Sequence, residues 1–160
     1  MELRIDGWRA GIRFAASHIL PGHPKCGRLH GHTYALHLAL FGEPDARGFL
    51  LDFAEVKEGL QKIAERLDHR FLFAEKGDYQ KYGRTATEVT FTFGGKSYAL
   101  PASDVEALPI AASTAESLAT YALDLFLASV KLPRNVERVE VGVDEGYGKG
   151  ARASRTVGRA

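Results

Sequence analysis

The chain has 160 residues, of which 45% are hydrophobic and 26% charged, and its formal net charge is +1. This is the composition of a globular protein with a sizeable core, and we expect a single domain over residues 1–160. Because the charge is near neutral, we do not expect a protein that binds nucleic acid. Because the sequence has no long apolar run and no basic leader, we do not expect a membrane or secreted protein. One cysteine cannot form an intrachain disulfide, so we expect a soluble cytoplasmic protein in a reducing compartment.

Two strands are predicted near the start. From Trp8 to His18 the apolar residues occupy even positions, which indicates a half-buried strand, with a short strand before it and Gly7 as a bulge. A loop rich in glycine and proline follows. A second strand then begins at His30 and places alternate side chains on one face as far as Leu40.

Helical spacing starts at Asp52 and continues to Leu67, with Asp52 and Glu55 as a capping pair. The segment STAESLATYALDLFLASV predicts a second helix, capped by Ser113 or Thr114. Between the helices, a β-hairpin over about 87–100 turns at Gly94-Gly95.

Two further strands follow the second helix. Val139, Val141 and Val143 alternate along the first, and the last covers Ala151 to Val157. The intervening GYGKG lacks the spacing and the trailing Ser/Thr of a phosphate-binding loop, so we interpret it as a turn. This order predicts an α+β domain: a four-stranded antiparallel sheet with two helices on one face, plus the inserted hairpin.

Three histidines form a candidate metal site. His30 and His32 project from one face of a strand, and His18 ends the neighbouring strand on its apolar face. Three imidazoles with one open position suit catalytic zinc. The alternative is polar histidines at strand ends that bond to backbone. His37 has the opposite parity and His23 lies in the loop, so both are left out.

Cys26 and the pair Asp68–His69 are candidate proton-transfer groups. Cys26 lies in a polar loop between Lys25 and Arg28, where cations or a metal would favour a thiolate, although a lone cysteine can also be a small buried hydrophobe. Asp68 could orient His69 as a base. Alternatively, His69 only complements the dipole at the end of the helix.

Two carboxylates complete the candidates. Glu116 lies three residues after Ser113, and a capping box is a sufficient explanation for it. Glu145 continues the apolar parity of Val139 to Val143 at the end of that strand. It therefore either emerges into solvent or awaits a ligand with matching hydrogen-bond donors.

Taken together, these segments resemble the 6-pyruvoyl-tetrahydropterin synthase family. The resemblance runs from Phe14 to Glu145 through FAASHIL, KCGRLHGHTYALHL, GFLLDFAEVK, RLDHRFL, STAESLA and VGVDEG. Its most specific part is the Cys-x-x-x-His-Gly-His block. Three residues separate Cys26 from His30, as in the branch that forms 6-carboxy-5,6,7,8-tetrahydropterin; other members carry glutamate in place of this cysteine.

The resemblance implies roles for these residues. His18, His30 and His32 match the zinc ligands; Cys26, Asp68 and His69 match the catalytic groups; Glu145 matches the pterin anchor; and Thr114 and Glu116 fall in the segment that lines the pterin pocket. It also implies the tunnelling fold, a homohexamer built as a dimer of trimers, and active sites between subunits.

The implied reaction converts 7,8-dihydroneopterin triphosphate to 6-carboxytetrahydropterin, a precursor of the 7-deazaguanines queuosine and archaeosine. A pyruvoyl-forming enzyme and a non-catalytic module that binds zinc or pterin are the alternatives. Lys25, Arg28 and Lys149, or an arginine of another subunit, are left open as triphosphate ligands.

Two features depart from the family pattern. The hairpin is extra relative to compact bacterial members, and Ser113 stands where the family motif has proline.

Overall fold

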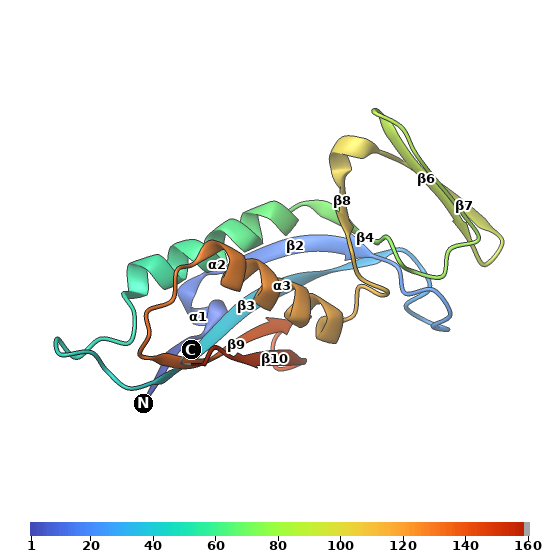
Figure 1. Ribbon diagram of the computed structural model, residues 1–160. Helices are drawn as coiled ribbons and strands as arrows, with labels where there is room; N and C mark the ends of the chain where they lie inside the picture. The colour runs from blue at the N-terminus through green and yellow to red at the C-terminus, as the bar shows by residue number, and fades with distance from the viewer. Residues whose placement is uncertain (159–160) are drawn as a thin grey trace.

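A computed structural model describes residues 1–158, and its largest element is a seven-stranded mixed sheet with two long helices on one face (Figure 1). In chain order the elements are β1 Glu2–Ile5, α1 Gly7–Ala10, β2 Arg13–His18, β3 His30–Gly42, α2 Phe53–Leu67, β4 Arg70–Ala74, β5 Lys81–Arg84, β6 Glu88–Phe93, β7 Lys96–Pro101, the 3-10 turn η1 Ala102–Asp104, β8 Val105–Leu108, α3 Ala115–Ser129, β9 Val136–Asp144 and β10 Gly150–Thr156. The strand order β10-β9-β3-β2-β4-β8, with β1 also paired to β3, confirms the α+β class and contains the four predicted antiparallel strands as neighbours.

Two strands of the main sheet were not predicted from the sequence: β4 pairs in parallel with β2, and β8 pairs in parallel with β4. The short strand expected before Gly7 is β1, which pairs with β3. Four of the five residues of β4 are buried, so this strand shows no alternation from which to recognise it. The predicted four-stranded sheet is therefore too small.

The prediction of one continuous strand from Trp8 to His18 is wrong at its start. Residues Gly7–Ala10 form the short helix α1, which Asp6 caps by accepting hydrogen bonds from the backbone N–H groups of Trp8 and Arg9 at 2.9 and 3.3 Å. Gly11 ends the helix with φ of 74°. β1 and β2 consequently lie end to end along the same edge of β3, with α1 between them.

The predicted start of α2 is confirmed, because the Asp52 side chain accepts from the backbone N–H of Ala54 at 2.7 Å. The predicted capping box of Ser113 and Glu116 is wrong. Thr114 is the cap of α3 and accepts from the backbone N–H of Ser117, so Glu116 is simply a residue of the first turn.

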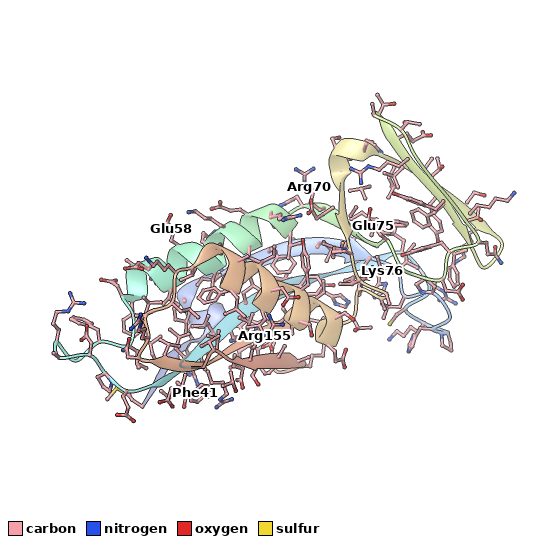
Figure 2. The ribbon with its side chains drawn as sticks, viewed as in Figure 1. Phe41, Glu58, Arg70, Glu75, Lys76 and Arg155 are labelled. Atoms are coloured by element: carbon pink, nitrogen blue, oxygen red, sulfur yellow. The ribbon has the colours of Figure 1, made fainter. Side chains whose placement is uncertain are left out.

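The helices and the sheet enclose the main core. Phe14 and Tyr34 stack across β2 and β3 with ring centroids 4.8 Å apart, under the apolar faces of α2 and α3. At the sheet edge, Arg155 of β10, labelled in Figure 2, donates to the Asp124 carboxylate of α3 at 2.7 Å. Within residues 1–158, no helix is long and apolar enough to span a membrane.

The predicted hairpin is confirmed as β6 and β7, with the turn at Gly94 and Gly95. β5 adds a third strand, and this separate sheet stands at one end of the main sheet beside β8 (Figure 1). We call β5–β7 the inserted sheet. A second hydrophobic core lies between the inserted sheet and the main sheet. Its buried residues are Ile19, Phe71, Phe73, Val89, Phe91 and Val105.

Candidate functional site

The structure brings His18, His30 and His32 together at the ends of β2 and β3. His18 and His30 are directly opposed in the strand register, and their Nε2 atoms lie 3.1 Å apart. One ring nitrogen of each histidine lies within 4.8 Å of those of the other two, so the group could hold a metal ion. His32 packs edge-on against both other rings. The antiparallel register thus produces the cluster that strand parity predicted.

The tautomers of two rings fit a cation. Nδ1 of His18 lies 2.8 Å from the carbonyl oxygen of Ser113, and Nδ1 of His30 lies 2.7 Å from that of Arg28. Carbonyl oxygens only accept, so each Nδ1 carries the proton and each Nε2 presents a lone pair. Two facing lone pairs call for a cation between them, and nitrogens bound to tetrahedral zinc lie about 3.3 Å apart.

Burial keeps the ring of His18 neutral. The residue is fully buried, and burial lowers the pKa of His18 to about 4, a shift that the hydrogen bond to Ser113 opposes. Burial also lowers the pKa of His32, assisted by the neighbouring charges of His30 and Lys149. Neutral imidazoles are the form that binds a metal.

Ser113 is a site residue that sequence reasoning missed. It is fully buried, its hydroxyl lies 3.1 Å from Nδ1 of His18, and its carbonyl accepts from the same nitrogen. Such partners fix the orientation of a metal-binding imidazole. Its place before α3 suggested only a cap, and no sequence signal distinguishes the two roles.

Gly31 allows the two histidine strands to approach closely. A Cβ atom at this position would lie 2.8 Å from the backbone carbonyl oxygen of Ala16 on β2. We therefore expect Gly31→Ala to push β2 and β3 apart and to weaken metal affinity roughly 10- to 100-fold, as disturbed supporting contacts do. Competition with a chelating dye measures this. Gly158→Ala, where a Cβ meets nothing within 4 Å, is the control, and equal affinities in the two variants would contradict the prediction.

Glu145 lies beside the histidine cluster with an unused hydrogen-bonding atom. Its Oε1 is buried and has no hydrogen-bond partner within residues 1–158. Burial raises the pKa of Glu145, and the nearby charge of Glu116 raises it further, while His30 and Lys149 oppose the shift. A half-buried carboxylate oxygen without a donor can accept a hydrogen bond from a ligand that supplies one.

Tyr34 also borders the cluster and was assigned only to the sheet by its sequence pattern. Its ring lies edge-on to His18 and His32, and its buried hydroxyl has no partner among the described residues. Burial, reinforced by the charge of Glu145, raises the pKa of this hydroxyl well above its usual range. Tyr34 therefore offers a neutral hydroxyl beside the rings.

Cys26 is half-buried in the loop between β2 and β3. The loop leads directly into the cluster, because the carbonyl of Arg28 holds Nδ1 of His30. Cys26 thus lies in the loop beside the three rings, and no hydrogen bond joins its thiol to them within residues 1–158.

Asp68 and His69 form the predicted pair. One Asp68 oxygen lies 2.8 Å from Nδ1 of His69, and the other accepts from the backbone N–H of Ala15 at 2.7 Å. His69 has φ of 55°, in the strained left-handed region, and its N–H donates to the carbonyl of Ala15 at 2.7 Å. The carboxylate thus fixes the ring with Nδ1 protonated and leaves Nε2 available.

Within residues 1–158, no hydrogen bond or ring contact joins the Asp68–His69 pair to the three rings. The His69 side chain is 84% exposed and borders a shallow depression on β2 and β3. Ala15, Ser17 and Thr33, which line it, have the opposite strand parity to the three rings, but His32 itself also borders the depression. His37 faces outward, as predicted, and lies 3.0 Å from the Asp144 carboxylate.

Comparison with known proteins gives consistent results. The model of the 6-pyruvoyl tetrahydropterin synthase family matches residues 9–155. A Methanocaldococcus jannaschii protein provisionally named 6-carboxy-5,6,7,8-tetrahydropterin synthase is 35% identical over 94% of each chain. A similarly named Pyrococcus abyssi protein is 31% identical over 82% of this chain and 79% of its own. The structure of 6-pyruvoyl tetrahydropterin synthase from Plasmodium vivax superposes with a TM-score of 0.90 at 26% identity and covers 98% of each chain.

Proposed function

Because this chain belongs to the 6-pyruvoyl tetrahydropterin synthase family, we propose that it is a zinc-dependent 6-carboxy-5,6,7,8-tetrahydropterin synthase, a lyase. Its substrate is 7,8-dihydroneopterin triphosphate. The reaction consumes one water. One carbon of the three-carbon side chain stays on the ring as the carboxylate, the other two leave as acetaldehyde, and triphosphate is released. The product feeds the synthesis of 7-deazaguanines such as queuosine or archaeosine.

The observation that supports this proposal best is the unpaired carboxylate of Glu145 beside three histidine rings. The edge of a pterin presents a ring N–H and an exocyclic amine, which are two parallel donors. A carboxylate can accept both, as it does from arginine, and such charge-assisted bonds are strong in a half-buried pocket. Thr114 and Glu116 would line the same pocket from the start of α3.

Zinc, held by His18, His30 and His32, would supply a Lewis acid that polarises the side-chain hydroxyl oxygens of the substrate. Cys26, as the thiolate, would remove the proton from the adjacent carbon. The Asp68–His69 pair would move a second proton at Nε2 of His69, which its hydrogen bonding leaves free.

The position of His69 supports active sites shared between subunits. His69 is largely exposed, and within residues 1–158 no hydrogen bond or ring contact joins it to the three rings, so the pair of one subunit would serve the thiol and metal of another. We propose the homohexamer of two trimers as the assembly that brings them together. We expect the enzyme in the cytoplasm, where its pterin substrate would be available.

Pyruvoyl-tetrahydropterin formation is the second candidate, favoured by the similarity to the Plasmodium vivax structure. That enzyme would lose triphosphate but keep all side-chain carbons on the ring. The three-residue spacing between Cys26 and His30 and the names of the archaeal relatives favour the carboxy branch.

Glu145→Gln tests the pterin site. We expect it to weaken binding of 7,8-dihydroneopterin roughly 10- to 100-fold, because the bonds to a charged acceptor are lost. Fluorescence titration measures this. Glu140→Gln lies in β9 at a position of opposite parity to Glu145, which follows directly after this strand, and should bind normally.

The variant Glu145→Gln also has an expected pH dependence of stability in the unliganded protein. The pKa of Glu145 is raised on folding, so its ionised form destabilises the fold at pH above that pKa and the penalty disappears as the pH falls below the unfolded value. Glu145→Gln should therefore raise the melting temperature at pH 7, with a smaller difference at pH 4. Unchanged pterin affinity would contradict the assignment of Glu145 as the anchor.

A further inference from the structure

The inserted sheet lies next to the loop between β2 and β3, which we call the thiol loop, residues 20–27. Figure 1 shows this loop at the same end of the main sheet as β6 and β7. The loop has no regular secondary structure, and its central residues Gly22 to Lys25 are exposed. The contacts that hold the thiol loop therefore determine the position of the Cys26 side chain.

Both ends of the thiol loop are anchored through the inserted sheet. Ile19, directly after His18, is fully buried in the core that Val89 and Phe91 of β6 help to form. Gly27, directly after Cys26, is buried against Phe93 at the end of β6: a Cβ atom on Gly27 would lie 3.3 Å from Cε1 of that ring. The main core beneath the helices contains neither loop end.

The interior of the loop is held by His23. Its Nδ1 accepts hydrogen bonds from the backbone N–H groups of Cys26 at 2.9 Å and Lys25 at 3.3 Å. Two backbone bonds close the same turn, from Gly27 N–H to the His23 carbonyl and from Leu20 N–H to the Cys26 carbonyl, both at 2.9 Å. The backbone of Cys26 is thus bound on both sides.

We propose that Phe93 and His23 are positioning residues for Cys26, and that the inserted sheet serves to hold the thiol loop. This inference rests on the proposed role of Cys26 as the proton-abstracting group. Such a group must lie within hydrogen-bond reach of its proton, and a displacement of about 1 Å can cost on the order of 100-fold in rate. Phe93 acts at the loop end next to the thiol, and His23 acts on the Cys26 amide itself.

The test uses the single cysteine of the chain, because alkylation by iodoacetamide then reports on Cys26 alone, with or without turnover. We expect Phe93→Ala to accelerate alkylation several-fold and to lower kcat about tenfold, with KM little changed. Phe93→Leu, which restores an apolar contact, should return both quantities towards the wild-type values. His23→Ala should behave like Phe93→Ala. His23→Asn should show an alkylation rate and a kcat closer to the wild-type values, because an amide oxygen can accept from backbone N–H groups two or three residues on.

Phe49→Ala is the matched control. It removes a largely exposed aromatic ring beside Arg47, in the connection between β3 and α2, away from the thiol loop and the inserted sheet. We expect wild-type alkylation and kcat. The proposal is overturned if folded Phe93→Ala retains both wild-type values, or if Phe49→Ala reproduces its effects. If Cys26→Ala retains turnover, the role of Cys26 fails instead, and the alkylation rates still report whether the inserted sheet holds the loop.

Discussion

Cys26→Ala is expected to lower turnover of 7,8-dihydroneopterin triphosphate about a thousandfold, the middle of the range for losing a positioned acid–base group. The side chain is half-buried in a loop, so its removal leaves no large cavity in either core. The metal content and the affinity for dihydroneopterin should stay at wild-type values. Steady-state release of triphosphate measures turnover, and metal analysis with fluorescence titration measures the rest.

Cys26→Ser is the informative companion to this variant. A hydroxyl keeps the size and shape of the thiol but does not ionise near neutral pH, so turnover should remain close to that of Cys26→Ala. Substantial activity in either variant would show that another group removes the proton.

Mixed oligomers are expected to regain activity from two inactive parents. His69→Ala alone should be strongly impaired, as Cys26→Ala is, because each removes one proton-transfer group. If the His69 of one subunit serves the Cys26 of another, unfolding and refolding an equal mixture should restore about a quarter of the sites by random assembly. Triphosphate release before and after mixing measures the recovery.

The control for the mixing experiment is Cys26→Ala mixed with Cys26→Ser, which leaves no intact thiol in any subunit and should stay inactive. An inactive mixture of the His69 and Cys26 variants, in oligomers shown to exchange subunits, would contradict sites that are shared between subunits.

The histidine cluster was predictable because it follows from local geometry. Alternation along β3 places His30 and His32 on one face, and an antiparallel neighbour brings His18 opposite. The four predicted strands and both long helices follow from similar periodicity. The tautomer of His18 was not predictable, because it depends on Ser113, which is 95 residues away along the chain.

Other features depend on tertiary contacts that no short pattern records. β4 and β8 are parallel strands that find partners only in the folded sheet. The helix α1 did have a signal, since Asp6 precedes Gly7 and Gly11 follows, but the alternation of apolar residues concealed it. The side of the sheet occupied by His69 depends on where β4 joins β2, so the sequence identifies the pair without placing it.

Product analysis with the zinc-loaded protein and 7,8-dihydroneopterin triphosphate tests the central claim most directly. Mass spectrometry identifies the pterin, and trapping as a hydrazone quantifies acetaldehyde. We predict 6-carboxytetrahydropterin with one acetaldehyde and one triphosphate per substrate consumed, and none of these products after metal removal by chelation. A pterin that retains all three side-chain carbons, or no consumption of substrate by the zinc-loaded protein, would contradict the proposed reaction.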